Sequence, residues 1–320
     1  GRPVEVEDAR YPNAPRIQLP SAFGAHNWHP MAFHPDTGLV YVPAQDIPGV
    51  YANDENFVYR EGLWNTGTST LPGALPDDAA TRKAIAATIK GRLLAWDPVA
   101  KEARWAFEHP TAWSGGILAT GGGLVFQGNI AGSFAAYDAA SGDRVWHVEA
   151  PAGVLSGPVS YEIDGEQYVA VTTGWGSVFA LVTGFAMPKT GGPELGKVLV
   201  FKLGGDAQMP EVALDAVERK PQTEAFGDDA MIARGKAEFY RTCVVCHGEG
   251  AIAAGVVTDL RWSQASGDAE LWKEVVIDGK YASNGMAAFG QHVSAETAED
   301  IRAYVVSRAH ADFAIAQAEE

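Results

Sequence analysis

The chain has 320 residues, of which 47% are hydrophobic and 10% aromatic, enough to build a substantial core and more than one domain of ordinary size. Its 40 acidic residues outnumber 24 basic ones, giving a formal net charge of −16. This excess excludes a basic face that could neutralise phosphates, so nucleic acid and anionic membranes are poor candidate partners and a basic protein is a better one. No apolar run approaches the ~20 residues that span a bilayer, and the first residues do not resemble a signal peptide. We therefore expect no transmembrane segment.

Residues 1–205 are rich in glycine, tryptophan and short β-prone runs, and they contain a repeated strand–turn–strand pattern. One copy is AWDPVAKEARW at residues 95–105, and the second is AYDAASGDRVW at residues 136–146. Their final residues, Trp105 and Trp146, lie 41 positions apart. This spacing is typical of one four-stranded blade of a β-propeller. At that spacing, residues 1–205 have room for roughly five blades.

Further strands are expected at residues 38–43, 123–127, 167–172, 177–182 and 197–203. Residues between 47 and 90 form a long insertion with a short helix at 78–89. A charged, proline-containing stretch without periodicity follows the last strand, and the sequence then becomes alanine- and glutamate-rich. We therefore predict a propeller part at residues 1–205, a linker at 206–226 and a helical domain at 227–320.

The only two cysteines form the sequence CVVCH at residues 243–247. This is the attachment signature of a c-type haem, because Cys243 and Cys246 can bond the two porphyrin vinyl groups while His247 becomes the proximal iron ligand. A redox dithiol followed by an unrelated histidine is the alternative interpretation. In a chain with two cysteines, the haem interpretation is strongly favoured.

Helical periodicity around this motif predicts three helices, and three helices around one haem resemble a small class I cytochrome c. The three expected helices begin after Asp228 or Asp229, at Asp268 and near Ser294. The distal ligand is predicted to be Met286, in a glycine-containing loop from which a thioether could reach the iron and raise its potential. A methionine buried in the core is the alternative for this position, and His292 and Met231 are less well placed as ligands.

Several segments of the first part resemble the type II quinohaemoprotein alcohol dehydrogenases, and the resemblance continues to the C-terminus. They are GAHNWHPM at 24–31, TGLVYVPA at 37–44, KGRLLAWDP at 90–98 and WSGG at 113–116. The resemblance implies an all-β partial propeller of the eight-bladed type, followed by an all-α class I cytochrome c domain. It also implies haem c, pyrroloquinoline quinone (PQQ) and calcium as cofactors, a periplasmic location, and an external electron acceptor such as a cytochrome c or a copper protein.

By the same resemblance, Asn27 and Trp28 contact the quinone. An amide can hydrogen-bond a quinone oxygen, and an indole offers an apolar face with one polar atom. A turn asparagine and a core tryptophan are the alternatives. The segment GWGSV at 174–178 is similar to the one that closes over the cofactor, although Ser177 replaces an expected glycine. Three further candidates for the quinone site are Gly176, Val178 and Trp113, the last of which could instead be a core residue of a blade.

In that family the catalytic aspartate and most calcium ligands lie N-terminal to the segment that corresponds to this chain. We therefore expect no catalytic residue in this chain, and a partner that supplies the N-terminal propeller, as in a split or nicked enzyme; a truncated fragment is the alternative. The predicted function is oxidation of small-molecule alcohols, polyols or aldehydes with PQQ, and electron transfer through haem c. The alternative is a non-catalytic electron-transfer or docking subunit that binds no quinone, against which Asn27 and Trp28 argue.

Overall fold

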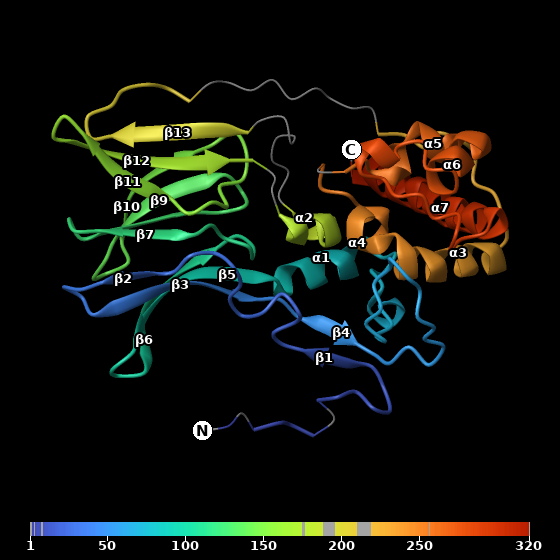
Figure 1. The fold of residues 1–320 in the computed structure, drawn as a ribbon, viewed down its shortest axis with the longest axis horizontal. Helices are drawn as coiled ribbons and strands as arrows, with labels where there is room; N and C mark the ends of the chain where they lie inside the picture. Colours follow the sequence, from blue (N-terminus) through green and yellow to red (C-terminus); the bar gives the residue numbers. More distant parts are fainter. Residues whose placement is uncertain are drawn as a thin grey trace.

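The computed structural model describes residues 2, 4–7, 9–174, 177–187, 196–209, 219–255 and 257–319. Antiparallel sheets occupy one end of the molecule and helices the other, with α1 and α2 between them (Figure 1). Within the part of the chain that the structure describes, no helix is both long enough and apolar enough to cross a membrane.

Apart from a two-stranded sheet described below, the described residues form three antiparallel sheets whose strands lie in chain order, as in propeller blades. The first sheet contains β2 (Ala32–His34), β3 (Leu39–Asp46), β5 (Lys90–Asp97) and β6 (Glu102–His109). The second contains β7 (Ile117–Thr120), β8 (Leu124–Gly128), β9 (Ser133–Asp138) and β10 (Arg144–Glu149). The third contains β11 (Val159–Ile163), β12 (Glu166–Thr173) and β13 (Lys197–Lys202). The propeller-like architecture is confirmed, but the expectation of about five blades is wrong, because the long insertion lies inside the first sheet and forms no blade of its own.

The repeated pattern corresponds to the last hairpin of each four-stranded sheet, β5–β6 and β9–β10. In both hairpins the aspartate that ends the first strand accepts two backbone N–H groups of the turn, Asp97 in one and Asp138 in the other. The indole of Trp105 donates to the carbonyl oxygen of Ala139 at 3.2 Å, in the turn of the next sheet. Gly142 in that turn has a φ of 80°, and a Cβ there would lie 2.6 Å from the Trp105 ring. The repeat therefore also packs one sheet against the next.

Residues 47–89, called the insertion below, join β3 to β5, which pair directly from Asp46 opposite Lys90. The insertion contains β4 (Gly49–Tyr51), the short 3-10 helix η1 (Leu71–Gly73) and α1 (Ala79–Thr88). β4 pairs with β1 (Arg16–Gln18) in a two-stranded sheet. α1 begins where predicted, because the Asp78 carboxylate accepts the backbone N–H of Thr81 at 2.6 Å.

The strand expected at residues 177–182 is absent, and the structure has the helix α2 (Val178–Val182) there, followed by the 3-10 helix η2 (Gly184–Ala186). Ser177 caps the helix by accepting the N–H of Phe179 at 3.1 Å, and Thr183 donates to the Phe179 carbonyl oxygen at 2.7 Å. The valines and the phenylalanine favour a strand by propensity alone. Capping at both ends and complete burial of the Phe179 side chain outweigh that propensity.

The C-terminal part is helical, as predicted. Its elements are α3 (Asp229–Thr242), α4 (Val244–His247), η4 (Glu249–Ala251), η5 (Leu260–Trp262), α5 (Gln264–Gly267), α6 (Ala269–Val276), η6 (Ala282–Asn284) and α7 (Ala295–Glu319). The three predicted starts are confirmed, since side chains of Asp228, Asp268 and Ser294 each accept an N–H of the first turn. α3 crosses α7 closely at Gly235, where a Cβ would lie 1.9 Å from the carbonyl oxygen of Asp300. Trp272 of α6 completes the core and donates to the Ala298 carbonyl oxygen at 2.7 Å.

Candidate functional site

An apolar cavity lies among the helices of the C-terminal part, and three of the four predicted haem-binding residues line it. The lining consists of Thr242, Cys243, His247, Thr258, Leu260, Ser263, Ala265, Trp272, Val275, Val276, Tyr281, Met286, Phe289, Val293 and Ile301. Cys246, the fourth, is exposed and lies in the same turn as Cys243 and His247. The structure therefore brings a thiol, an imidazole and a thioether to one largely hydrophobic space.

The His247 imidazole is held in one orientation by the chain that follows it. Its Nδ1 lies 3.2 Å from the carbonyl oxygen of Thr258, and because a carbonyl can only accept, Nδ1 carries the hydrogen. Nε2 is then the atom with a free lone pair, the form in which histidine binds a metal. Burial lowers the pKa of His247 below its ordinary value, which also favours the neutral ring. Sequence patterns could not identify Thr258 as this partner, since it contributes only a backbone oxygen.

The two cysteines belong to one turn, with Cys243 ending α3 and Cys246 inside α4. Burial, and then the charge of nearby Glu238, raise the pKa of the Cys243 thiol to about 12. Redox dithiols and thiolate metal ligands need a lowered pKa, so this environment disfavours the redox alternative.

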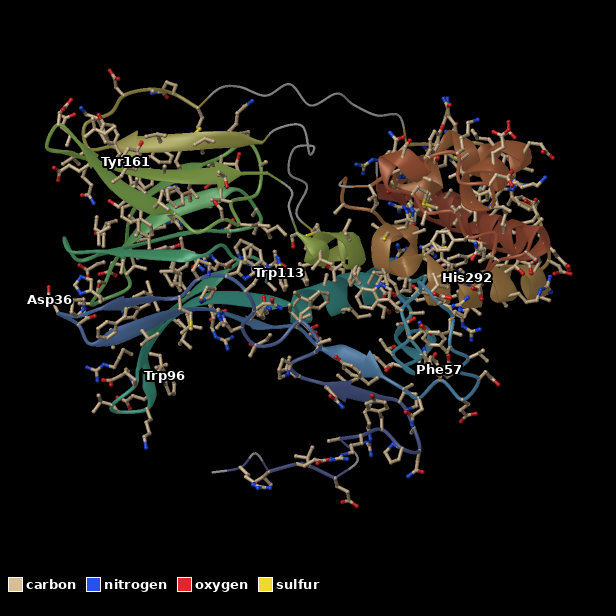
Figure 2. All side chains as sticks on the ribbon, in the orientation of Figure 1. Asp36, Phe57, Trp96, Trp113, Tyr161 and His292 are labelled. Carbon is tan, nitrogen blue, oxygen red and sulfur yellow. The ribbon has the colours of Figure 1, made fainter. Side chains whose placement is uncertain are left out.

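Met286 follows η6, just after Gly285, which has a φ of 96° and ends the helix in the left-handed conformation. Its backbone N–H donates to the carbonyl oxygen of Tyr281 at 3.2 Å, and the half-buried side chain packs against the helical core. The two alternative ligands lie elsewhere: Met231, in the first turn of α3, and His292, labelled in Figure 2, are both absent from the cavity lining. Of the distal-ligand candidates, Met286 is the one at the cavity.

These residues fit a c-type haem. Aliphatic and aromatic side chains would suit a porphyrin, the paired thiols would suit its vinyl groups, and an imidazole with a thioether would suit its iron as ligands. The fit rests on the donor set and on the apolar lining, both present in the chain.

The second group of predicted residues lies in the loop before β2. The Asn27 side chain donates to the carbonyl oxygen of Phe23 at 2.9 Å and accepts the backbone N–H of Trp28 at 2.8 Å. An amide has two hydrogens and two lone pairs, so each end keeps one hydrogen bond for a ligand. The Trp28 side chain is 57% exposed. Trp28 is therefore accessible from outside the loop, whereas Asn27 is partly buried.

Behind Trp28 lies a stack of aromatic rings that ends at α2. His29 stacks on Trp28 with ring centroids 4.1 Å apart, and meets the edge of Trp113 at 5.1 Å. Trp113 stacks on Phe179 of α2 at 5.0 Å with a 9° angle between rings. In Figure 2 Trp113 is labelled at the end of the sheets that faces the helices. Trp113 also has a φ of 67°, a strained conformation that is common at ligand sites.

Three buried polar atoms of this stack, His29 Nε2, Trp113 Nε1 and Ser114 Oγ, make no hydrogen bond to any described residue. Buried polar groups are rarely left in this state, so the cluster suits a polar ligand such as a quinone. Burial, and then the nearby His26, lower the pKa of His29 to about 4. Sequence reasoning missed His29 and Ser114, although both stand in the quoted motifs.

Two further quinone candidates are Gly176 and Val178. Gly176 lies outside the described residues, and Val178 is the first residue of α2, with a side chain that is 49% exposed. α2 in turn packs against the haem-motif turn: a Cβ on Gly248 would lie 3.0 Å from the carbonyl oxygen of Leu181. The two groups of predicted residues are therefore joined through α2.

Two family models match the chain. One describes the β-propeller domain of glucose, ethanol and alcohol dehydrogenases and matches residues 77–169. The other describes subunit III of cbb3-type cytochrome c oxidase and matches residues 230–305. These matches fall on the sheets and on the helical part respectively.

Curated relatives match nearly the whole chain. Quinohemoprotein alcohol dehydrogenase ADH IIB of Pseudomonas putida is 42% identical over 98% of this chain and 44% of its own length. The dehydrogenase subunit of alcohol dehydrogenase (quinone) of Komagataeibacter europaeus is 35% identical over 97% of this chain and 42% of its own length. The chain thus spans less than half the length of the curated relatives it matches.

Solved structures agree with these sequence matches. The structure of ADHIIG from Pseudomonas putida HK5 superimposes with a TM-score of 0.86 at 33% identity, over 97% of this chain and 46% of that one. The Comamonas testosteroni quinohemoprotein alcohol dehydrogenase gives a TM-score of 0.76 at 34% identity, over 97% and 45% of the two chains. Over nearly its whole length the chain is homologous to the quinohaemoprotein alcohol dehydrogenases, of which it matches the C-terminal half.

Proposed function

We propose that this chain is the haem-bearing part of a quinohaemoprotein alcohol dehydrogenase and also forms one side of its quinone site. The observation that carries the proposal is the meeting of Cys243, His247 and Met286 at one apolar cavity, in a chain 42% identical to such an enzyme. The proposed division is a propeller part at 1–205, a linker at 206–226 and a cytochrome domain at 227–320.

In the cytochrome domain, Cys243 and Cys246 would bond the porphyrin, and His247 and Met286 would bind its iron. When bound, haem c supplies one-electron oxidation and reduction. The chain itself orients the imidazole through Thr258 and surrounds the site with apolar side chains that limit water. As a ligand of the iron, the thioether of Met286 would favour the reduced form and so raise the potential.

In the propeller part, the Asn27 amide would hydrogen-bond the quinone and Trp28 would contact it, with Trp113, Gly176 and Val178 as further candidates. When bound, PQQ accepts two electrons from the alcohol. The unpaired polar atoms of His29, Trp113 and Ser114 support a polar ligand here. We place the catalytic base and the remaining blades in residues outside this chain, in the same polypeptide or in a partner chain. Calcium is implied by the family resemblance alone and is tested by chelation.

The proposed electron acceptor is an external cytochrome c or copper protein, and its contact surface should be basic because the chain carries a net charge of −16. The proposed compartment is the periplasm, where thioether attachment of haem takes place.

A second function has one observation in its favour. Both ends of the Asn27 amide are already bonded to backbone groups of its own loop, which a loop without a ligand would also show. On this alternative the chain is an electron-transfer subunit that binds no quinone.

The deciding experiment measures the denatured mass of the purified protein and its visible spectrum before and after addition of PQQ, calcium and an alcohol. With the residues that supply the catalytic base and the remaining blades present in the purified protein, the proposal expects a haem-sized mass on the polypeptide that contains this chain, reduction of that haem by alcohol, and loss of the reduction on chelation. Quenching of tryptophan fluorescence by PQQ distinguishes the functions further, because Trp28 and Trp113 would lie at the proposed quinone site. A haem that stays oxidised and fluorescence that stays unquenched would leave only the electron-transfer subunit.

A further inference from the structure

The insertion lies along the cytochrome domain, although it belongs to the first sheet of the propeller part (Figure 1). Arg60 pairs with Glu238 of α3 at 3.1 Å, and both side chains are largely buried, at 21% and 17% exposure. The Thr70 hydroxyl donates to the carbonyl oxygen of Tyr240 at 2.8 Å. The insertion therefore binds the helix that leads into the CVVCH turn.

A second contact lies directly behind that turn. The Tyr240 hydroxyl accepts the backbone N–H of Leu75 at 3.0 Å and that of Gly250 at 3.1 Å. The Glu249 carboxylate lies 3.3 Å from the same Leu75 nitrogen. Leu75 is buried, and a Cβ on Gly250 would lie 3.2 Å from its side chain. The insertion thus touches the residues that immediately follow His247.

A third contact is a buried charge cluster centred on Asp312 of α7. Its carboxylate lies 2.8 Å from Arg82 of α1, 2.7 Å from Arg261 and 2.7 Å from Arg308. The side chains of Asp312 and Arg82 are only 8% and 12% exposed. Burial alone would raise the pKa of Asp312, but Arg308 and Arg261 outweigh it and hold the pKa below its ordinary value, so the carboxylate is charged. Arg308 also pairs with Asp77, which precedes α1.

The haem-motif turn is also contacted by α2 and η2. A Cβ on Gly248 would lie 3.0 Å from the Leu181 carbonyl oxygen, and one on Gly184 would lie 2.1 Å from the Ile252 carbonyl oxygen. Such close backbone contacts leave no room for sliding. The CVVCH turn and the residues that follow it are therefore contacted by both α2 and the insertion.

We propose that the insertion is an interdomain clamp, with Arg82 as its principal positioning residue, that fixes the haem-bearing domain in one position on the propeller part. Resting on the proposed function, the clamp makes electron transfer between the two cofactor sites proceed at a set distance, without a docking step before each transfer. Arg82 acts through Asp312 and touches neither cofactor site.

Arg82→Ala tests the clamp selectively, because Asp312 keeps Arg261 and Arg308 as partners and is not left as an unpaired buried charge. Arg82→Lys is the conservative variant. The matched control is Arg104→Ala, which removes an exposed pair with Glu102 on β6, far from the helices.

The first measurement is independent of the quinone. A fluorescent dye is attached through Ala140→Cys, an exposed turn position of the propeller part, and its lifetime reports energy transfer to the haem. The native protein and the Arg104→Ala control are expected to give one narrow lifetime distribution. Arg82→Ala is expected to broaden it and Arg82→Lys to restore it in part, with an unchanged haem spectrum in every variant. A distribution that Arg82→Ala leaves narrow would overturn the clamp.

The second measurement follows haem reduction by alcohol as the viscosity is raised. Reduction in the native protein is expected to be insensitive to viscosity, whereas in Arg82→Ala it slows in proportion, since domain motion then precedes transfer. If alcohol does not reduce the native haem, the proposed function fails while the lifetimes still decide on the clamp. If Arg82→Ala does not fold, Arg60→Ala and Thr70→Val are made instead, because these two side chains are less buried than Arg82. A broadened lifetime distribution in these variants then supports the clamp, and a narrow one overturns it.

Discussion

Acid should destabilise the sheet part through His29, and the expected size of the effect follows from its burial. The imidazole is 2% exposed, and its pKa is about 4 instead of 6.5. Below pH 6.5 the unfolded chain binds a proton at this position that the folded chain does not. The contribution of neutral His29 to the free energy of unfolding is therefore fully present above pH 6.5. It is lost as the pH falls towards 4, and it changes little below that. Since one pKa unit corresponds to about 1.4 kcal/mol, the loss by pH 4 is about 3 kcal/mol.

The assay compares the native protein with His29→Gln, which cannot take up a proton. Denaturant unfolding followed by tryptophan fluorescence gives the free energy of unfolding of both proteins at several values between pH 7 and 4. Other titrating groups, including Glu249 with its pKa of about 7, are common to the two proteins and cancel in the difference. The free energy of unfolding of the native protein minus that of His29→Gln should be about 3 kcal/mol smaller at pH 4 than at pH 7. A difference that stays constant with pH would refute a buried, neutral His29.

Three further outcomes are expected. Met286→Ala should lower the reduction potential of the haem, while Met231→Ala should not; a redox titration in which both variants behave alike contradicts Met286 as the ligand. Tyr240→Phe should cost about 1–3 kcal/mol, because the buried N–H of Gly250 loses its acceptor; an unchanged thermal midpoint argues against that hydrogen bond. Gly235→Ala should cost about 3 kcal/mol or more by separating α3 from α7, measured by helical circular dichroism on heating, and a tolerated alanine would mean that the helices are less closely packed.

Features that depend on neighbouring residues could be predicted from the sequence. The aspartate turns at Asp97 and Asp138 and the helix starts at Asp228, Asp268 and Ser294 form through hydrogen bonds within three residues, so their signals are local. The gathering of Cys243, His247 and Met286 was predictable for another reason, since one porphyrin needs all of these donors.

Features set by distant contacts could not be predicted. Residues 177–182 have strand propensity, but Phe179 packs on Trp113, which is far away in the sequence. The predicted number of blades was too high, because no local sequence pattern shows that β3 and β5, on either side of the insertion, pair with each other. The burial of His29, whose Nε2 has no hydrogen-bond partner among the described residues, likewise arises only when Trp28 and Trp113 enclose it.

The clamp joins residues that are far apart in the sequence, and this separation affects how the protein folds during synthesis. Its bonds to the cytochrome domain join residues 165 to 231 positions apart, so the insertion emerges from the ribosome long before its partners exist. Contacts of such separation form late in folding. We expect the insertion to be a protease-sensitive segment until the C-terminal helices are complete, and its protection then marks the molecules that have finished maturation.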